Sequence, residues 1–278
     1  MTKPDLPRPD LRDRYRATAR ELVRFRGKTS RSTDLSLAVL SFAILILVWI
    51  AISESGLVRD VYMPSPVRVA VALYSLFVNF NFIYDVGVSI FRVMTAFAIA
   101  AAMAIPLGIL MSSFRIFGAM QEPVIDLIRY LPVPALVPLM VIWFGIGETS
   151  KIALLWMGTF FQLILLIADG ARRVPNEYVE ICYTLGARSR QVLRWIILPA
   201  QMPTMVDNLR ITLGWCWSYV IIAEIVAANE GIGHVIWISR RFGKTPEVLA
   251  GVLAIGIIGL ASDQIIRYIH RRCFRYMG

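Results

Sequence analysis

Six stretches of the chain are long and apolar enough to cross a lipid bilayer, and they constrain the fold more than any other feature. The hydrocarbon core of a bilayer is about 30 Å thick, which roughly 20 helical residues cross. Leu35–Ile52 and Val93–Phe114 contain no charged residue. The six expected spans cover about 35–52, 86–114, 122–147, 151–170, 206–228 and 247–268. With 57% hydrophobic and 17% charged residues, neither an ordinary soluble globule nor a disordered chain is compatible with this composition.

The basic residues indicate how these spans are oriented. The chain has 29 Lys and Arg against 19 Asp and Glu, and ten of the basic residues precede the first span. Cytoplasmic segments of membrane proteins carry an excess of Lys and Arg. We therefore expect both termini in the cytoplasm, which an even number of spans allows. The basic excess reflects topology, so no nucleic-acid partner is expected.

The expected organisation is all-α, with a basic cytoplasmic tail over 1–33 and a transmembrane domain over 34–272. The longest polar segment between two spans is the cytoplasmic loop 172–203. It predicts two short helices, Tyr178–Leu185 and Ser189–Ile197, joined at Gly186, because glycine readily ends a helix in a left-handed conformation. The second helix is expected to end before Pro199. Two short helices of this kind form a projecting knob suited to docking into a groove of another protein.

The residues of this knob resemble the EAA signature of the membrane subunits of bacterial ABC importers. Glu180, Gly186 six residues later and then Leu198-Pro199 follow the pattern, whereas Ile181-Cys182 replaces two expected alanines. In that family the loop is the coupling helix, which is seated in a cleft of the cytoplasmic ATPase. The resemblance implies that the ATPase contacts Glu180, Tyr183, Leu185, Gly186, Ala187 and Arg188.

Further motifs resemble one branch of this family, the nitrate, sulfonate and bicarbonate permeases, which include taurine permeases. These motifs are Met63–Pro66, Ile142–Lys151, Leu185–Arg188, Ala223-Glu224 and Glu230–Gly233. The resemblance implies a type I ABC importer permease fold in the bacterial inner membrane and a small anionic substrate. It also implies a homodimer of this chain, two ATPase subunits that bind ATP and Mg, and an extracytoplasmic binding protein that delivers the substrate.

This chain is not expected to hydrolyse ATP or to bind a cofactor. Gly27-Lys28-Thr29 and Gly243-Lys244-Thr245 resemble part of a phosphate-binding loop, but that loop needs a glycine five residues earlier. Leu22 and Ile238 occupy those positions. The three cysteines and two histidines form no metal-binding motif, so no metal site is expected either.

The candidate pathway residues lie within or beside the spans, where ionisable groups are costly and often functional. Arg92 either attracts an anion or extends to the membrane interface, Arg129 either lines the pathway or pairs with Asp126, and Glu224 either faces the pathway or hydrogen-bonds a neighbouring span. Trp143 is either a gate or an interface anchor. Pro134 belongs to a proline-rich stretch, Leu131–Pro138, where the backbone is expected to be irregular near the pathway or the dimer interface.

The competing function is an ion-gradient-driven transporter or a channel that works without an ATPase. Such a protein requires coupled carboxylates or a selectivity filter, and often internal repeats. The chain has a single glutamate inside the spans and no repeat. We therefore favour the ABC importer subunit.

Overall fold

The computed structural model describes residues 30–227 and 229–275, and it divides into two units, 1–66 and 67–278. The described residues are helical apart from short connections, with no strand among them. Most of the expected basic tail over 1–33, and the Gly27-Lys28-Thr29 tripeptide, lie outside the described residues.

The first unit contains α2 (Arg31–Glu54). The hydroxyl of Ser30 caps this helix by accepting a hydrogen bond from the backbone N–H of Thr33 at 3.3 Å. The apolar side chains of α2 lie on all sides of the helix, and none of its most apolar 18-residue window is buried. A helix that is apolar all round is adapted to lipid or to other membrane helices.

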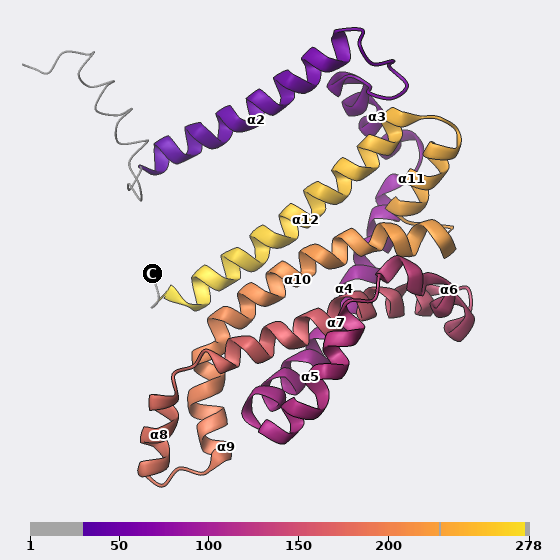
Figure 1. Ribbon diagram of the computed structural model, residues 1–278. Helices are drawn as coiled ribbons and strands as arrows, with labels where there is room; N and C mark the ends of the chain where they lie inside the picture. Colours follow the sequence, from indigo (N-terminus) through magenta and orange to yellow (C-terminus); the bar gives the residue numbers. More distant parts are fainter. Residues whose placement is uncertain (1–29, 228, 276–278) are drawn as a thin grey trace, which may run out of the picture. The chain divides into compact units, whose positions relative to one another are not determined.

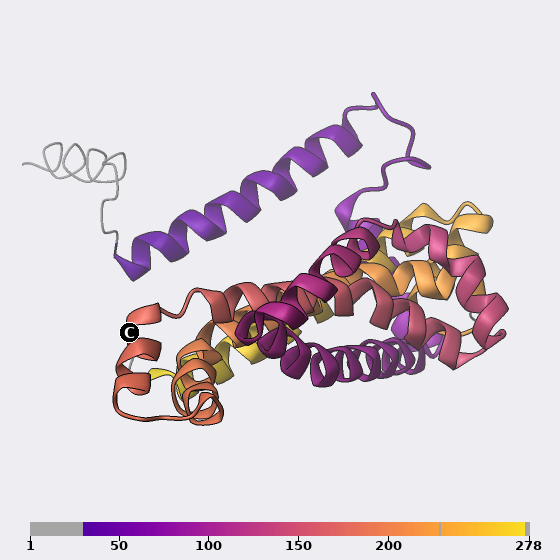
Figure 2. The same cartoon turned by 60° about the horizontal axis from the view of Figure 1, so that its bottom comes forward.

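The second unit carries the remaining helices. In chain order they are α3 (Pro66–Asn79), α4 (Phe82–Ser113), α5 (Arg115–Arg129), α6 (Val133–Phe144), α7 (Glu148–Arg172), α8 (Asn176–Thr184), α9 (Ser189–Val192), the π-helical turn η1 (Leu193–Ile197), α10 (Leu198–Ala227), α11 (Ile232–Arg241) and α12 (Thr245–Cys273). Figures 1 and 2 show α8 and α9 at one end of this unit and α6 and α11 at the other. The helices α7 and α10 run between the two ends.

The core of the second unit is the close packing of α4 against α7. Ala96, Ala100, Ala104 and Gly108 follow each other at four-residue intervals on α4, and all four are buried. This spacing puts them on one helix face, and small residues let two helix backbones approach closely. A Cβ atom at Gly108 would lie only 2.7 Å from the carbonyl oxygen of Ile164 on α7, so glycine is needed there for space.

The expected span 122–147 is broken into two helices. The helices α5 and α6 meet at an angle of 100° across Tyr130–Pro132. The irregular stretch is shorter than the expected Leu131–Pro138, because Pro134 lies in the first turn of α6. In the first turn of a helix the backbone N–H groups have no partner within the helix, so the missing N–H of a proline costs no hydrogen bond. Pro138 is accommodated inside the helix.

In the part of the chain that the structure describes, four helices, α2, α4, α7 and α12, are long and apolar enough to cross a membrane, and the α5–α6 pair makes a fifth span if it crosses as one unit. The helix α10 covers the remaining expected span and has 30 residues, a length of about 45 Å. Each of the six expected ranges therefore coincides with a helix or a helix pair. The six-span topology with both termini inside stays a prediction.

The expectation that the second loop helix ends before Pro199 is wrong. From Ser189 the chain stays helical through α9 and η1 into α10, which contains both Pro199 and Pro203. In η1 the backbone N–H of Leu198 bonds to the carbonyl of Leu193, five residues back. This wider turn lies directly before Pro199, where an α-helix would have to accommodate the proline ring and its missing donor.

Candidate functional site

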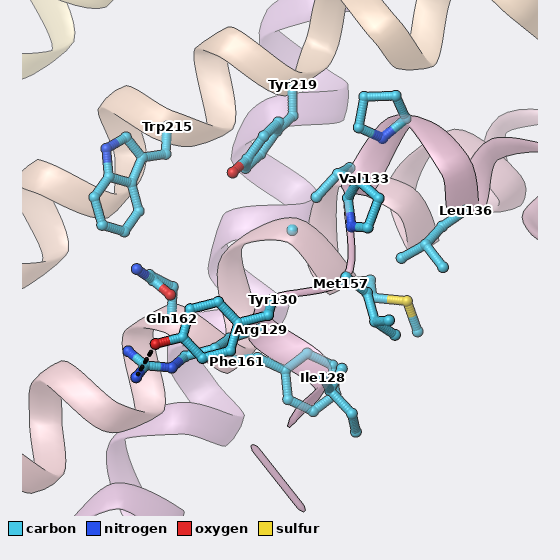
Figure 3. Close-up of a pocket in the computed structure, with 14 residues that line it drawn as sticks. Ile128, Arg129, Tyr130, Val133, Leu136, Met157, Phe161, Gln162, Trp215 and Tyr219 are labelled. Atoms are coloured by element: carbon cyan, nitrogen blue, oxygen red, sulfur yellow. Dashed lines mark hydrogen bonds between the residues drawn. The ribbon is translucent and has the colours of Figure 1, made fainter. Parts of the chain in front are cut away.

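A cavity of about 470 Å³ lies where the break between α5 and α6 faces α7 and α10. The break contributes residues 128–134, including the candidate residues Arg129 and Pro134. From α7 come Met157, Gly158, Phe161 and Gln162, and from α10 come Trp215 and Tyr219. Side chains four residues apart share a helix face, so each helix presents one face to the cavity (Figure 3).

Arg129 is the one charged side chain among the residues that line this cavity. Its Nε lies 3.0 Å from Oδ1 of Asp126, so the ion pair expected from their spacing is present. Its Nη2 donates to the hydroxyl of Tyr130 at 3.1 Å, and the guanidinium carbon lies 4.7 Å from the centre of the Tyr130 ring. A guanidinium has five N–H donors, and the described part of the chain provides no hydrogen-bond acceptor for Nη1. Arg129 is therefore held in place while retaining donors for an anion.

A second polar site, the Arg92 cluster, consists of Ser89, Arg92, Glu148 and Glu224. Arg92 is only 1% exposed and donates from Nε and Nη2 to the two carboxylate oxygens of Glu148, each at 2.6 Å. Its Nη1 donates to Glu224 Oε1 and to the carbonyl of Glu230, both at 2.8 Å. Four of the five N–H donors of Arg92 are thus used by partners from the ends of α7 and α10 and from the connection between α10 and α11.

Glu224 is completely buried, and every oxygen of its carboxylate has a donor. Besides Arg92, it accepts hydrogen bonds from the hydroxyl of Ser89 at 2.7 and 3.0 Å and from the backbone N–H of Gly233 at 2.7 Å. The glycines of the Glu230–Gly233 motif leave room for it. A Cβ at Gly231 would lie 2.5–2.6 Å from the carboxylate, and the φ of Gly231 is +110°, which disfavours any other residue.

Together with Lys151, the Arg92 cluster contains two cations and two carboxylates. Lys151 donates to Glu148 at 2.8 Å, so Arg92 and Lys151 face the two carboxylates of Glu148 and Glu224. A buried arginine that already binds two carboxylates has little capacity to attract a free anion. The structure also brings Glu148–Lys151 to Ala223-Glu224 and Glu230–Gly233, two motifs that lie much later in the sequence.

The loop between α7 and α10 forms the expected projection. Gly186 has a φ of +81° and follows α8 in a Schellman arrangement, in which the N–H of Ala187 bonds to the carbonyl of Cys182 and the N–H of Gly186 to that of Tyr183, both at 2.9 Å. Of the six candidate coupling residues, Glu180, Tyr183, Leu185, Gly186 and Arg188 are exposed and Ala187 is half-buried. Leu185 is 81% exposed, so an apolar side chain stands at the tip of the projection.

The remaining candidates lie apart from the cavity. Trp143 is 60% exposed near the end of α6 and does not line the cavity. Arg92 and Glu224 are in the Arg92 cluster. The sequence interpretation did not select Gln162, Trp215 or Tyr219. The only signal for them was the presence of polar or amphipathic side chains on spans where most neighbours are apolar.

Comparison with known proteins shows the family to which this chain is related. The family model described as "Binding-protein-dependent transport system inner membrane component" matches residues 100–275. The taurine transport system permease protein TauC of Escherichia coli is 33% identical over 92% of this chain and 94% of its own length. The bicarbonate transport system permease protein CmpB of Synechococcus elongatus is 30% identical over 68% of each chain.

Solved structures have the same fold. An amino acid ABC transporter chain has a TM-score of 0.59 at 15% identity, with 77% of this chain and 99% of the other covered. A chain of the MetNI methionine ABC transporter in an inward-facing conformation has a TM-score of 0.55 at 18% identity, with 65% and 92% covered. The expected all-helical permease fold, the inner-membrane location and the role of a transport subunit rather than an enzyme are confirmed. The chain belongs to the family of inner-membrane components of binding-protein-dependent transport systems.

Proposed function

We propose that this permease subunit carries a small organic anion of the sulfonate class through the cavity beside Arg129, in an importer driven by ATP. The observation that carries the proposal is the placement of one incompletely satisfied guanidinium in a cavity of about 470 Å³ with aromatic walls. Arginine suits sulfonate, nitrate and bicarbonate alike because its planar donors match planar or tetrahedral oxyanions. Aromatic walls add apolar contact surface, which an organic sulfonate can use and an inorganic anion cannot.

The names of the relatives point to the same chemistry. TauC is named for taurine, an aminosulfonate, and CmpB for bicarbonate. The greater identity and coverage of TauC, together with the size of the cavity, favour a sulfonate over nitrate or bicarbonate.

Energy is proposed to come from a separate ATPase that binds ATP and Mg and contacts the 180–187 segment. The exposed apolar tip at Leu185 and the neighbouring Tyr183 and Ile181 form a surface suited to a groove. The proposed assembly contains two copies of this chain, two ATPase subunits and an extracytoplasmic binding protein that delivers the anion.

Two helices link the projecting loop to the cavity. The helix α7 enters the loop and α10 leaves it, and both also line the cavity. Near the loop, the side-chain amide of Gln201 donates to the carbonyl of Ile167 at 2.6 Å and that of Asn208 to the carbonyl of Leu166 at 2.8 Å. These bonds join α10 to α7, so we propose that movement of the loop shifts both helices together and changes access to the cavity.

We assign Arg92 and Glu224 a bracing role instead of a place in the pathway. Their charges are balanced, their side chains are buried, and they tie α4, α7 and α10 at the end away from the projecting loop. Because the helices are fixed at that end, movement of the projecting loop at the other end changes the tilt of α7 and α10.

Two experiments test the proposed function. Purification of the tagged chain in a mild detergent should bring an ABC ATPase with it; a transport-competent preparation without any ATPase would contradict the proposal and favour a gradient-driven transporter. In the reconstituted complex, Arg129→Ala should reduce taurine uptake by about tenfold to hundredfold, the value of a hydrogen bond to a charged group. Arg271→Ala, which removes an exposed arginine at the end of α12, is the control and should transport normally.

A further inference from the structure

A glycine on α7 and a tyrosine on α10 make a close contact in the wall of the cavity. A Cβ atom at Gly158 would lie 2.8 Å from Cδ2 and 3.0 Å from Cε2 of the Tyr219 ring. It would also lie 3.2 Å from a methyl group of Val133 on α6. The ring of Tyr219 therefore rests directly on the backbone of α7, at the point where three cavity-lining helices meet.

Space, and not backbone conformation, requires the glycine at this position. Gly158 is in the middle of α7, where glycine is less favourable than alanine by about 1 kcal/mol, and its φ is not in the left-handed range. Elsewhere in the same unit, a Cβ at Gly87 or Gly256 would meet nothing within 4 Å. The distinctive property of Gly158 is that it lets the Tyr219 ring withdraw from the cavity.

Tyr219 can yield toward the cavity. Its ring is backed by α7 on one side and borders the cavity on the other, and the side chain is half-buried. Figure 3 shows its hydroxyl end directed toward the space beside Trp215, with Arg129 on the opposite side of the cavity. A side chain at position 158 has to push the ring into the cavity by more than half an ångström to reach ordinary contact distance.

We propose that the Gly158–Tyr219 contact determines the longest organic sulfonate that the cavity admits. The sulfonate group binds at Arg129, and the remainder of the molecule extends toward the Tyr219 ring. The position of the ring against Gly158 sets the length of the cavity. Each methylene group that no longer fits should lower the uptake of that sulfonate by about tenfold or more. This inference rests on the proposed function, because it assumes that the anion passes through this cavity.

The test uses the complete importer in proteoliposomes, with its ATPase and binding protein, and unbranched alkanesulfonates from methanesulfonate to hexanesulfonate as probes. Uptake by each variant is divided by uptake by the wild type at the same chain length, so the selectivity of the binding protein cancels. For Gly158→Ala, this ratio should fall by about tenfold or more for the longest sulfonate that the wild type transports, and by less than about twofold for methanesulfonate. Gly256→Ala, with open space around it, is the matched control and should leave every ratio near one.

A second substitution at Tyr219 separates the length effect from a general defect. Tyr219→Ala removes the ring, so the Gly158→Ala/Tyr219→Ala double variant should recover uptake of the long sulfonates. Tyr219→Ala alone should raise the uptake of the longest sulfonate relative to methanesulfonate, which tests the proposal even if Gly158→Ala fails to fold. Equal losses at all chain lengths, or a loss that Tyr219→Ala does not reverse, would overturn the inference.

The Arg129→Ala variant in the same assay distinguishes the two proposals. If it lowers the uptake of every sulfonate while Gly158→Ala shows no length dependence, the pathway stands and only the length inference fails. If Arg129→Ala transports all of them normally, the cavity is not the pathway and the proposed function itself fails.

Discussion

Replacing Arg92 by methionine should destabilise the protein far more than the same replacement at Arg129. Arg92 is 1% exposed and Glu224 is fully buried, whereas the side chains of Arg129 and Asp126 are 31% and 43% exposed. Without Arg92, the carboxylate of Glu224 keeps the donors from Ser89 and Gly233 but loses its only cation within hydrogen-bonding distance among the described residues. Glu148 loses two hydrogen bonds and keeps Lys151.

The expected cost follows from this difference in burial. Removing one partner of a buried ion pair costs about 3–5 kcal/mol, because the other charge is left uncompensated. For a chain of this size this corresponds to a fall of roughly 10 °C in the apparent unfolding midpoint. An exposed pair such as Arg129–Asp126 contributes about 0–1 kcal/mol, so Arg129→Met should lower the midpoint by no more than a few degrees.

The assay is the loss of the monodisperse peak of the detergent-solubilised, fluorescently tagged protein after heating. The Arg92→Met/Glu224→Gln double variant should regain a substantial part of the lost stability, because no unpaired buried charge remains. A loss for Arg92→Met no larger than that for Arg129→Met would refute the bracing role. The bracing role would also be refuted if the double variant lost more stability than the losses of the two single variants added together.

Three further predictions follow from named contacts. Gly186→Val should leave the protein in the membrane but abolish substrate-stimulated ATP hydrolysis by the complex, because a β-branched residue disfavours a φ of +81°. Asparagine tolerates that conformation, so Gly186→Asn should retain most of the stimulated hydrolysis. Equal hydrolysis by the two variants would contradict the reasoning. Gly108→Leu should prevent the close packing of α4 on α7 and remove the monodisperse peak at temperatures that the wild type survives, whereas Gly87→Leu, facing open space, should not. Glu122→Gln should lower the free energy of unfolding by at most about 1 kcal/mol, because the side chains of Glu122 and Arg172 are both more than one-third exposed. A shift of the unfolding midpoint as large as that of Arg92→Met would show that burial does not determine how much these ion pairs stabilise the protein.

Much of the architecture could be predicted from local sequence. Every expected span coincides with a helix or a helix pair, because an apolar run of this length can satisfy its backbone in a membrane only as a helix. The loop projection could also be predicted, since Gly186 marks the end of α8 by its own conformational freedom. The ion pair between Asp126 and Arg129 could be predicted as well, because three-residue spacing within one helix brings two side chains together.

The end of the second loop helix could not be predicted from its prolines. A proline in isolation indicates a helix end, but the π-helical turn before Pro199 and tertiary contacts keep the helix continuous into α10. The hydrogen bonds from Gln201 and Asn208 to the backbone of α7 support it from outside. Such support comes from residues more than 30 positions away in the chain.

Sequence alone therefore established the membrane class, the helices, the projecting loop and the family resemblance, since all of these depend on neighbouring residues. Only the tertiary structure showed which partners the intramembrane charges have. It placed Arg92 between Glu148 and Glu224, which are 56 and 132 residues away, and left Arg129 facing a cavity with Gln162 and Tyr219. The physical reason is that the role of a buried charge depends on which opposite charges reach it, and helix packing brings those partners from distant parts of the chain.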